Sequence, residues 1–254
     1  RVGSARLLAG IDAVELPRRR VPGLYRRRDR LCERMDLAPP PLFVADIAAP
    51  NALSIGGPTW GVVVLDRRLL TLLTVDELEG ILAHELAHLE RRDAFIQTLA
   101  VSTMRTLAAL VFLLLLPVTL IAIGTARAVA WLMGQPQHAP NVAALVTRFV
   151  ELGVGLGLSV FTLVLLAYSR RREFVADGRA AAVTGQPRAL ARALAKIHRA
   201  ADPRWGLRSL LTIHGDESTS AWRRLLSSHP PIEERLERLA DVERRLISAD
   251  RDHR

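Results

Sequence analysis

Two long stretches without a charged side chain constrain the fold of this chain more than any other feature. They cover residues 106–126 and 152–169 and are 21 and 18 residues long. At about 1.5 Å of rise per residue, an 18-residue helix is about 27 Å long, close to the roughly 30 Å hydrocarbon core of a bilayer. Both stretches exceed the usual length of a core helix, so we favour a transmembrane hairpin over a buried hairpin inside a soluble domain.

Arginines near the ends of these stretches predict the orientation of the hairpin. Seven lie just before the first stretch or just after the second: Arg91, Arg92, Arg105, Arg170, Arg171, Arg172 and Arg179. The connecting segment holds two, Arg127 and Arg148. Because basic residues concentrate on the cytoplasmic side of a membrane, we expect the connecting segment to face outward and both flanking parts to lie in the cytoplasm.

The composition narrows the possible functions. The chain is 50% hydrophobic and 24% charged, which is enough apolar surface to bury a core and excludes a disordered chain. Its net charge of +9 is accompanied by a single lysine, Lys196, and 5% aromatic residues, so we expect no nucleic-acid binding. The only cysteine, Cys32, excludes an internal disulfide and a cysteine-rich zinc site, and we expect it to be a buried bystander.

Periodicity and turn signals predict an α+β, mainly helical fold. Its three parts are residues 1–105, the hairpin at 106–169 and residues 170–254. Thr74 and Glu77 match a capping box and predict a helix that begins at Val75. Three helices are expected in the last part, from about residue 171, over 187–201 and after Pro231.

A small sheet is expected before the Val75 helix. The apolar segment 42–47 and the β-branched run at 61–66 predict two strands that pair with each other. Residues 50–61, between them, are expected to form turns, and the basic segment 17–35 is expected to be helical.

His84, Glu85 and His88 form the pattern H-E-x-x-H inside the helix that begins at Val75. Residues four apart lie on one face of a helix, so both imidazoles reach one ion, and Glu85 is placed to contact water at that ion. With seven histidines and thirteen glutamates in the chain, the pattern is expected by chance about 0.01 times. It predicts a hydrolytic zinc site with Glu85 as general base.

A catalytic zinc site needs a third protein ligand. Where that ligand is a glutamate, it lies on a second helix in the pattern E-x-x-x-D, whose aspartate hydrogen-bonds a ligand histidine. Two pairs fit, Glu173 with Asp177 and Glu237 with Asp241. We favour Glu173, because it follows the second hydrophobic stretch on the same side as the two histidines, whereas Glu237 lies among charged residues of an amphipathic helix. Further candidates are His138, His198, His214, His229 and His253.

Together these motifs resemble the HtpX-like family of membrane zinc metallopeptidases, which is related to the type I CAAX prenyl proteases. The resemblance covers about residues 31–246 and rests on four motifs in the family's order: PNALSIGG, ELEGILAHELAHLERRD, RRREFVADGRAA and SSHPPIEERLERL. It implies a gluzincin fold with the hairpin inserted between the HExxH helix and the third-ligand helix. It also implies one zinc ion per chain, held by His84, His88 and Glu173, with Asp177 supporting a ligand histidine.

The same resemblance implies where substrate binds. Asn51, Ala52 and Gly56 belong to the family's N-A-x-x-x-G motif, and they are expected on an edge segment along which a peptide extends as an added strand. His229, in the His-Pro motif, is our candidate for stabilising the oxyanion; the alternative is that it only caps the final helix.

We therefore expect a membrane-anchored zinc endopeptidase that cuts membrane or misfolded proteins in protein quality control. Its partners would be protein or peptide substrates and the lipid bilayer, and its catalytic part would face the cytoplasm at the inner membrane of a bacterial cell. Two alternatives are a sensor-transducer of the β-lactam response, which predicts an extracytoplasmic ligand domain, and a CAAX-type protease, whose large chamber two spans cannot build. HtpX-like proteins often have earlier spans, which residues 1–49 lack, so such spans either precede Arg1 or do not exist in this member.

Overall fold

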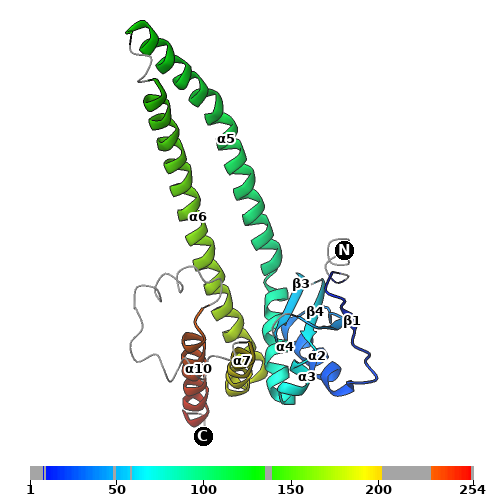
Figure 1. The fold of residues 1–254 in the computed structure, drawn as a ribbon. Helices are drawn as coiled ribbons and strands as arrows, with labels where there is room; N and C mark the ends of the chain where they lie inside the picture. Colours follow the sequence, from blue (N-terminus) through cyan, green and yellow to red (C-terminus); the bar gives the residue numbers. More distant parts are fainter. Residues whose placement is uncertain are drawn as a thin grey trace. The chain divides into compact units, whose positions relative to one another are not determined.

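A computed structural model of the chain describes residues 8, 10–47, 50–57, 59–134, 139–201 and 230–252. The chain divides into two compact units. The first combines Arg1–Ile96 with Tyr168–Arg254 and holds the sheet and the shorter helices, whereas the second is Gln97–Ala167 and consists of two long helical segments (Figure 1). The expected mainly helical fold with a small sheet is confirmed.

The sheet of the first unit is mixed and has the strand order β1-β2-β4-β3. Its strands are β1 (Val14–Glu15), β2 (Leu42–Ala45), β3 (Ala52–Gly57) and β4 (Trp60–Asp66). The expected pairing of the two apolar strands is confirmed: β2 runs parallel to β4, with Leu42 opposite Val63. The turns expected over residues 50–61 are wrong for β3, which pairs antiparallel with β4 and forms an edge of the sheet. Its small residues hide the strand pattern, and pairing with β4 supplies what local propensity does not.

Gly56 permits the tight connection between β3 and β4. Its φ is +117°, a backbone conformation that side-chain-bearing residues rarely adopt, and a Cβ there would lie 2.5 Å from the carbonyl oxygen of Trp60. The glycine of the N-A-x-x-x-G motif therefore has a structural reason, apart from any contact with substrate.

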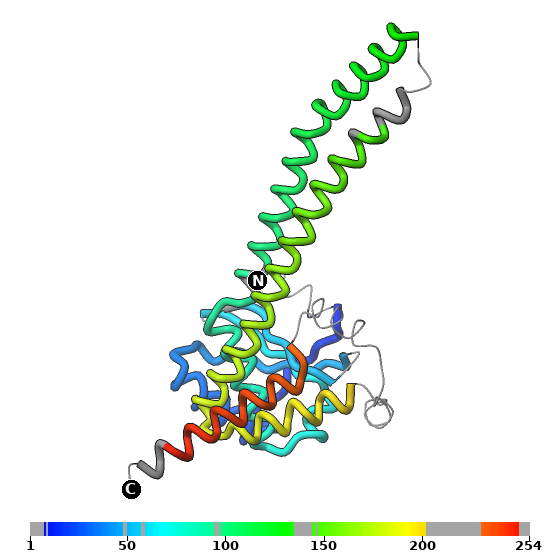
Figure 2. Tube along the Cα trace, turned by 90° about the vertical axis from the view of Figure 1, so that its left-hand side faces the viewer, coloured from blue at the N-terminus to red at the C-terminus, as the bar shows by residue number. Residues whose placement is uncertain are grey.

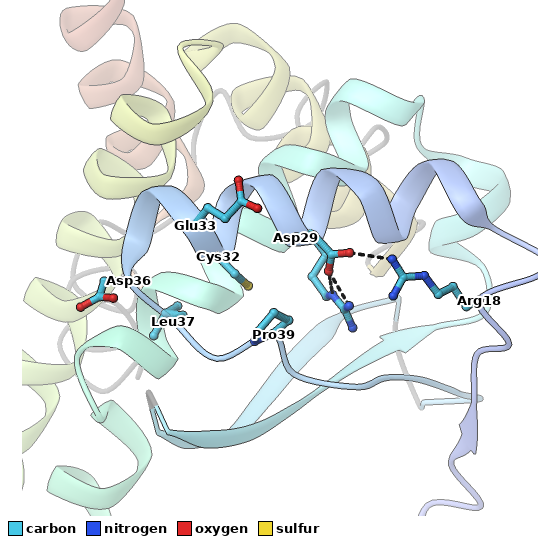
Figure 3. Close-up of a pocket in the computed structure, with 8 residues that line it drawn as sticks. Arg18, Asp29, Cys32, Glu33, Asp36, Leu37 and Pro39 are labelled. Atoms are coloured by element: carbon cyan, nitrogen blue, oxygen red, sulfur yellow. Dashed lines mark hydrogen bonds and ion pairs between the residues drawn. The ribbon is translucent and has the colours of Figure 1, made fainter.

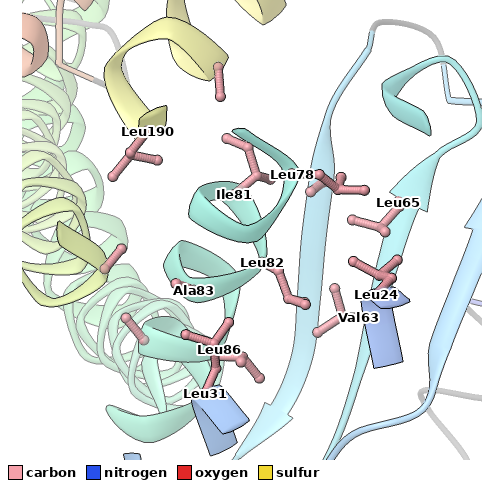
Figure 4. Close-up of a cluster of buried hydrophobic side chains, with 14 of the residues drawn as sticks. Leu24, Leu31, Val63, Leu65, Leu78, Ile81, Leu82, Ala83, Leu86 and Leu190 are labelled. Carbon is pink, nitrogen blue, oxygen red and sulfur yellow. The ribbon is translucent and has the colours of Figure 1, made fainter. Parts of the chain in front are cut away.

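Helix α4 is the central element of the first unit. It spans Val75–Glu90 and begins at the predicted capping box, in which Thr74 and Glu77 each accept a hydrogen bond from the other's backbone N–H. Leu82 and Leu86 on this helix are fully buried in the main hydrophobic cluster (Figure 4). Such a helix, apolar nearly all round, is stable only when other elements cover it on several sides.

Other helices and the sheet cover the apolar surface of α4. The sheet and helix α2 (Pro22–Met35) contact it, and so does α7 (Pro187–Ala201). The contact with α7 depends on Gly80, because a Cβ at this position would lie 3.1 Å from the Cα of Leu190. Helix α10 (Ile232–Asp252) packs on α7, and Figure 2 shows the two running side by side. The short helix α3 (Leu69–Leu72) lies in the chain between β4 and α4.

The second unit holds the two hydrophobic stretches. They lie on helices α5 (Asp93–Leu132) and α6 (Ala139–Thr184), which run alongside each other in opposite directions within this unit (Figures 1 and 2). Both are long and apolar enough to cross a membrane, with mean hydropathy of 2.8 and 2.2 over their best 18-residue windows. No residue of either window is buried, and Phe112 and Leu113 are 65% and 64% exposed, so the alternative of a buried hairpin is not what the structure shows. Residue 171 lies inside α6 and does not begin a separate helix.

Candidate active site

His84, His88 and Glu173 come together although the whole hairpin separates them in sequence. Each offers one ligand atom, and these atoms all lie within 4.8 Å of one another. The Nε2 atoms of the two histidines are 3.2 Å apart, and each lies 3.6 Å from a carboxylate oxygen of Glu173. Two histidines one helical turn apart on α4 thus face a carboxylate on α6, as expected from the sequence.

Asp177 lies behind His84. Its Oδ1 is 3.0 Å from His84 Nδ1, the ring nitrogen that points away from the cluster. Arg235, on α10, donates from Nε and Nη2 to the two oxygens of Asp177, each at 2.7 Å, and its Nη1 lies 3.4 Å from Glu173. A buried guanidinium therefore holds Asp177 in a two-pronged ion pair, which fixes the carboxylate plane that faces His84.

Asp93 occupies the corresponding position behind His88. Its Oδ2 lies 2.7 Å from His88 Nδ1, and its side chain is almost fully buried. Arg172 approaches the same residue, with Nε 3.5 Å from Oδ2 and Nη1 donating to the Asp93 carbonyl at 3.2 Å. Each histidine of the cluster is thus backed by its own aspartate, and each aspartate by its own arginine.

The electrostatics of the cluster favour a bound cation. Burial alone would lower the pKa of His84, but its contacts with Asp177 and then Glu173 raise that pKa to about 10. The two carboxylates therefore favour positive charge at this cluster. Two imidazoles and a carboxylate are also the donor set that zinc accepts in a catalytic site, so the residues present fit a zinc ion.

Glu85 is buried on α4 between the two histidine positions of the motif. The pKa of Arg235 is raised even though burial would lower it, first by Asp177 and also by the charges of Glu173 and Glu85. Glu85 therefore lies within electrostatic range of the guanidinium that contacts both Asp177 and Glu173. The general-base role of Glu85 stays a prediction.

The competing ligand candidates that the structure describes do not join the cluster. Glu237 and Asp241 are exposed on α10, so the second E-x-x-x-D pair is a solvated charged face. His198 is described on α7 and is not part of the cluster. The remaining candidates lie outside the described residues: His138, His214, His229 and His253. The expected oxyanion role of His229 therefore stays a prediction.

Asn51, Ala52 and Gly56 lie at the edge of the sheet. Ala52 and Gly56 belong to β3, and exposed Asn51 directly precedes it. Asn51 caps the start of the strand, because its Oδ1 accepts a hydrogen bond from Ala52 N at 2.9 Å. Among the described strands, β3 pairs only with β4, and its other edge is where an added strand would pair.

Asp93, Arg172 and Arg235 were not predicted from the sequence as parts of the metal site. Asp93 is the fifth residue after His88, too far for the helical i+4 rule, and Arg235 lies on a helix whose pattern is that of an ordinary amphipathic one. The sequence did contain one indication of their role, because each lies inside one of the family motifs. Asp93 is in the motif of the two histidines, Arg172 in that of Glu173 and Arg235 in that of the His-Pro dipeptide.

A cavity of about 420 Å³ lies beside α2 and is lined by residues other than those of the cluster (Figure 3). Cys32 lines it, and burial raises the pKa of this thiol to about 11, so it stays protonated and unreactive at neutral pH. The expectation that Cys32 is a buried bystander agrees with this environment.

Comparison with known proteins identifies the family of this chain. The model of peptidase family M48 matches residues 19–243. The chain is 32% identical over 235 residues to a protease HtpX homolog of Pyrococcus furiosus, covering 87% of this chain and 73% of that protein. It is 35% identical over 230 residues to the homolog of Acidiphilium cryptum, covering 86% and 73%.

A solved structure shares the fold. The crystal structure of S. mikatae Ste24p aligns with a TM-score of 0.52 at 21% sequence identity. The alignment covers 85% of this chain but 49% of the Ste24p chain, so this protein corresponds to about half of that structure. At 21% sequence identity, this similarity supports a shared fold and nothing beyond it.

Proposed function

Because this chain belongs to peptidase family M48, we propose that it is a membrane-anchored zinc endopeptidase that cuts membrane or misfolded proteins in protein quality control. It is an HtpX-like metallopeptidase with a His-His-Glu ligand cluster. The observation that carries the proposal is the convergence of His84, His88 and Glu173, with Glu85 on the same helix as the two histidines.

In this proposal His84, His88 and Glu173 hold one zinc ion per chain. A zinc ion bound there supplies a Lewis acid that polarises the scissile carbonyl and acidifies water. Glu85 takes the proton of the attacking water and passes it to the leaving amine. Asp177 Oδ1, 3.0 Å from His84 Nδ1, favours the ring orientation in which Nε2 faces the cluster, and Arg235 holds Asp177 in place.

The substrate proposed is a polypeptide in extended conformation. The free edge of β3 supports this, because a peptide that pairs there gains backbone hydrogen bonds that do not depend on its sequence. Such binding suits an enzyme that acts on many misfolded proteins. Asn51, Ala52 and Gly56 are the residues that we assign to this edge, and His229 remains our candidate for stabilising the oxyanion.

We also propose that α5 and α6 cross the inner membrane of a bacterial cell and that the metal cluster faces the cytoplasm. The exposed apolar side chains of both helices would be covered by lipid, which removes the cost of leaving them in water. The arginines that flank the two apolar stretches support the cytoplasmic orientation.

Replacement of Glu85 by glutamine tests the proposed activity. Glutamine is nearly isosteric but cannot accept a proton, so Glu85→Gln should keep zinc while casein hydrolysis falls by about 10² to 10⁴. The measurement is proteolysis of casein by the purified full chain in detergent, with zinc content determined on the same sample. Hydrolysis by the variant at more than about 1% of the wild-type rate would contradict the assigned role of Glu85.

A further inference from the structure

Asp93 lies at the start of a membrane helix and contacts a metal-ligand residue. It is the first residue of α5, and α4, which carries His88, ends at Glu90. Between them Arg92 adopts a φ of +56°, in the left-handed region that few residues with a side chain occupy. This reversal belongs to the short turn after α4, and the Asp93 carboxylate that follows it lies 2.7 Å from His88 Nδ1.

The geometry around His88 gives each ring nitrogen a separate task. Nε2 faces His84 at 3.2 Å and Glu173 at 3.6 Å, whereas Nδ1 faces Asp93. A carboxylate at Nδ1 holds the proton on that nitrogen and leaves Nε2 free to donate its lone pair. The arrangement therefore selects the tautomer and the ring orientation that a ligand at Nε2 requires.

Arg172 connects this aspartate to the other side of the cluster. It directly precedes Glu173 on α6, and it contacts both the carboxylate and the backbone carbonyl of Asp93. Arg91 also faces Asp93, but at 4.0 Å and with its side chain 45% exposed, so solvent screens it more strongly. Arg172 is the cation whose contacts join the first residue of α5 to the helix that carries the third ligand.

We propose that Asp93 is a positioning residue for His88 and that Arg172 acts on the metal site through Asp93. This inference rests on the proposed zinc site and assigns it a second Asp-Arg pair beside Asp177 and Arg235. Because Asp93 and Arg172 belong to the two helices that carry the hydrophobic stretches, the pair also makes the orientation of a metal ligand depend on how the ends of α5 and α6 meet.

The chain contains a matched control for this pair. Glu90, also at the end of α4, accepts hydrogen bonds from Arg179 of α6 at 2.7 and 3.0 Å. Like the Asp93–Arg172 pair, it joins the region where α4 ends and α5 begins to α6. Its carboxylate, however, contacts Arg179 and not a ligand histidine. Breaking it removes an ion pair between α4 and α6 without removing a partner of His88.

The test measures zinc affinity of the full chain in detergent by competition with a chromophoric chelator. Asp93→Ala should weaken zinc binding about 10- to 100-fold, as expected when the partner of a metal-bound histidine is removed. Asp93→Asn should recover part of this loss, because its amide oxygen still accepts the Nδ1 proton. Glu90→Gln should bind zinc as the wild type does. Wild-type affinity in Asp93→Ala, or an equal loss in Glu90→Gln, would overturn the proposal.

Two further readouts separate positioning from a loss of folding. Melting of the zinc-free proteins, followed by circular dichroism, shows whether each variant is folded; a positioning role predicts weaker zinc binding by a folded Asp93→Asn protein. The visible spectrum of the cobalt form should change in the Asp93 variants and not in Glu90→Gln, since it reports the geometry of the ligands. Unchanged zinc affinity and cobalt spectrum in a folded Asp93→Asn protein would overturn the positioning role.

A double-mutant cycle tests the part assigned to Arg172. Arg172→Ala should weaken zinc binding in the wild-type background and should have no further effect in Asp93→Ala. Equal effects in both backgrounds would show that Arg172 does not act through Asp93. If the wild-type chain itself binds no zinc, the proposed function fails and this inference fails with it, whereas wild-type binding with an unaffected Asp93→Ala variant refutes only the inference.

Discussion

Glu173 and Glu237 occur in the same E-x-x-x-D spacing, and only their surroundings distinguish them. Glu173 is 3% exposed and lies within 3.6 Å of both ligand histidines, whereas Glu237 is exposed on the face of α10. A carboxylate in such a buried position needs a cation, and the cluster supplies imidazoles and Arg235 for that purpose. The burial of each glutamate and its contacts with histidine and arginine decide between the two. A spacing pattern contains neither kind of information.

Zinc content of alanine variants checks this assignment. Glu173→Ala removes a ligand and its charge, so zinc should be lost, whereas Glu237→Ala should retain zinc fully. Asp177→Ala should be milder, with an affinity about 10- to 100-fold weaker, because it removes the group that orients His84 and not a ligand. Metal analysis of the three purified proteins decides the matter, and zinc retained in Glu173→Ala but lost in Glu237→Ala would refute both the ligand set and the alignment behind it.

At the scale of elements, α4 was predictable and β3 was not. The capping box and the apolar periodicity that define α4 are local, since they involve residues at most a few positions apart. β3 is rich in small residues and becomes a strand through pairing with β4, which its own composition does not reveal. The same contrast separates His84 and His88, which one helical turn brings together, from Arg235, which reaches Asp177 only through the packing of α10.

The capping residue Glu77 predicts how the stability of α4 depends on pH. Its side chain is 2% exposed, and Glu77 Oε2 accepts hydrogen bonds from Lys196 Nζ at 2.7 Å and Thr74 N at 2.9 Å. Burial would raise the pKa of Glu77, but Lys196 and then the Thr74 backbone outweigh it and lower that pKa. A lowered folded-state pKa contributes stability that is complete above the ordinary glutamate pKa of about 4.3 and is lost as the pH falls through the folded value.

Replacement of Glu77 by glutamine should therefore destabilise the protein at pH 7 by about 1 to 3 kcal/mol, because Lys196 loses its charged partner. The difference in Tm between wild type and variant should shrink as the pH falls below about 4. Thermal unfolding in detergent, followed by circular dichroism across this range, measures both effects. Glu237→Gln, at an exposed position, serves as control; a Tm difference for Glu77→Gln that is independent of pH would contradict the assigned ion pair.

At the scale of the whole molecule, the ligand set constrains the membrane topology. His84 precedes the two apolar stretches and Glu173 follows them, yet both belong to one compact unit. If α5 and α6 each cross the bilayer once, the chain returns to the side from which it left, which is what a shared metal site requires. The number of crossings between the two halves of the site must therefore be even. The arginine distribution is the basis of our proposal that the site lies on the cytoplasmic side.

Cysteine labelling in cells checks the orientation. Met133→Cys, at an exposed position directly after α5, should react with a membrane-impermeant maleimide added from outside, whereas Glu237→Cys should react only after permeabilisation. The wild-type chain provides the background, because its single cysteine, Cys32, is buried. The reverse labelling pattern would contradict a cytoplasmic active site.

The sequence by itself determined the local parts of this protein: the H-E-x-x-H helix with its cap, the length and polarity of the two long helices, and the likeness of four motifs to one family. The physical reason is that helical periodicity and capping act between near neighbours in the chain. Tertiary structure decided which E-x-x-x-D glutamate meets the histidines, that β3 forms an edge of the sheet, and that Arg235 and Arg172 support the two aspartates behind the ligands. These depend on contacts between residues distant in sequence. Removing one partner of a buried ion pair leaves an uncompensated charge and costs far more than removing one partner of an exposed pair.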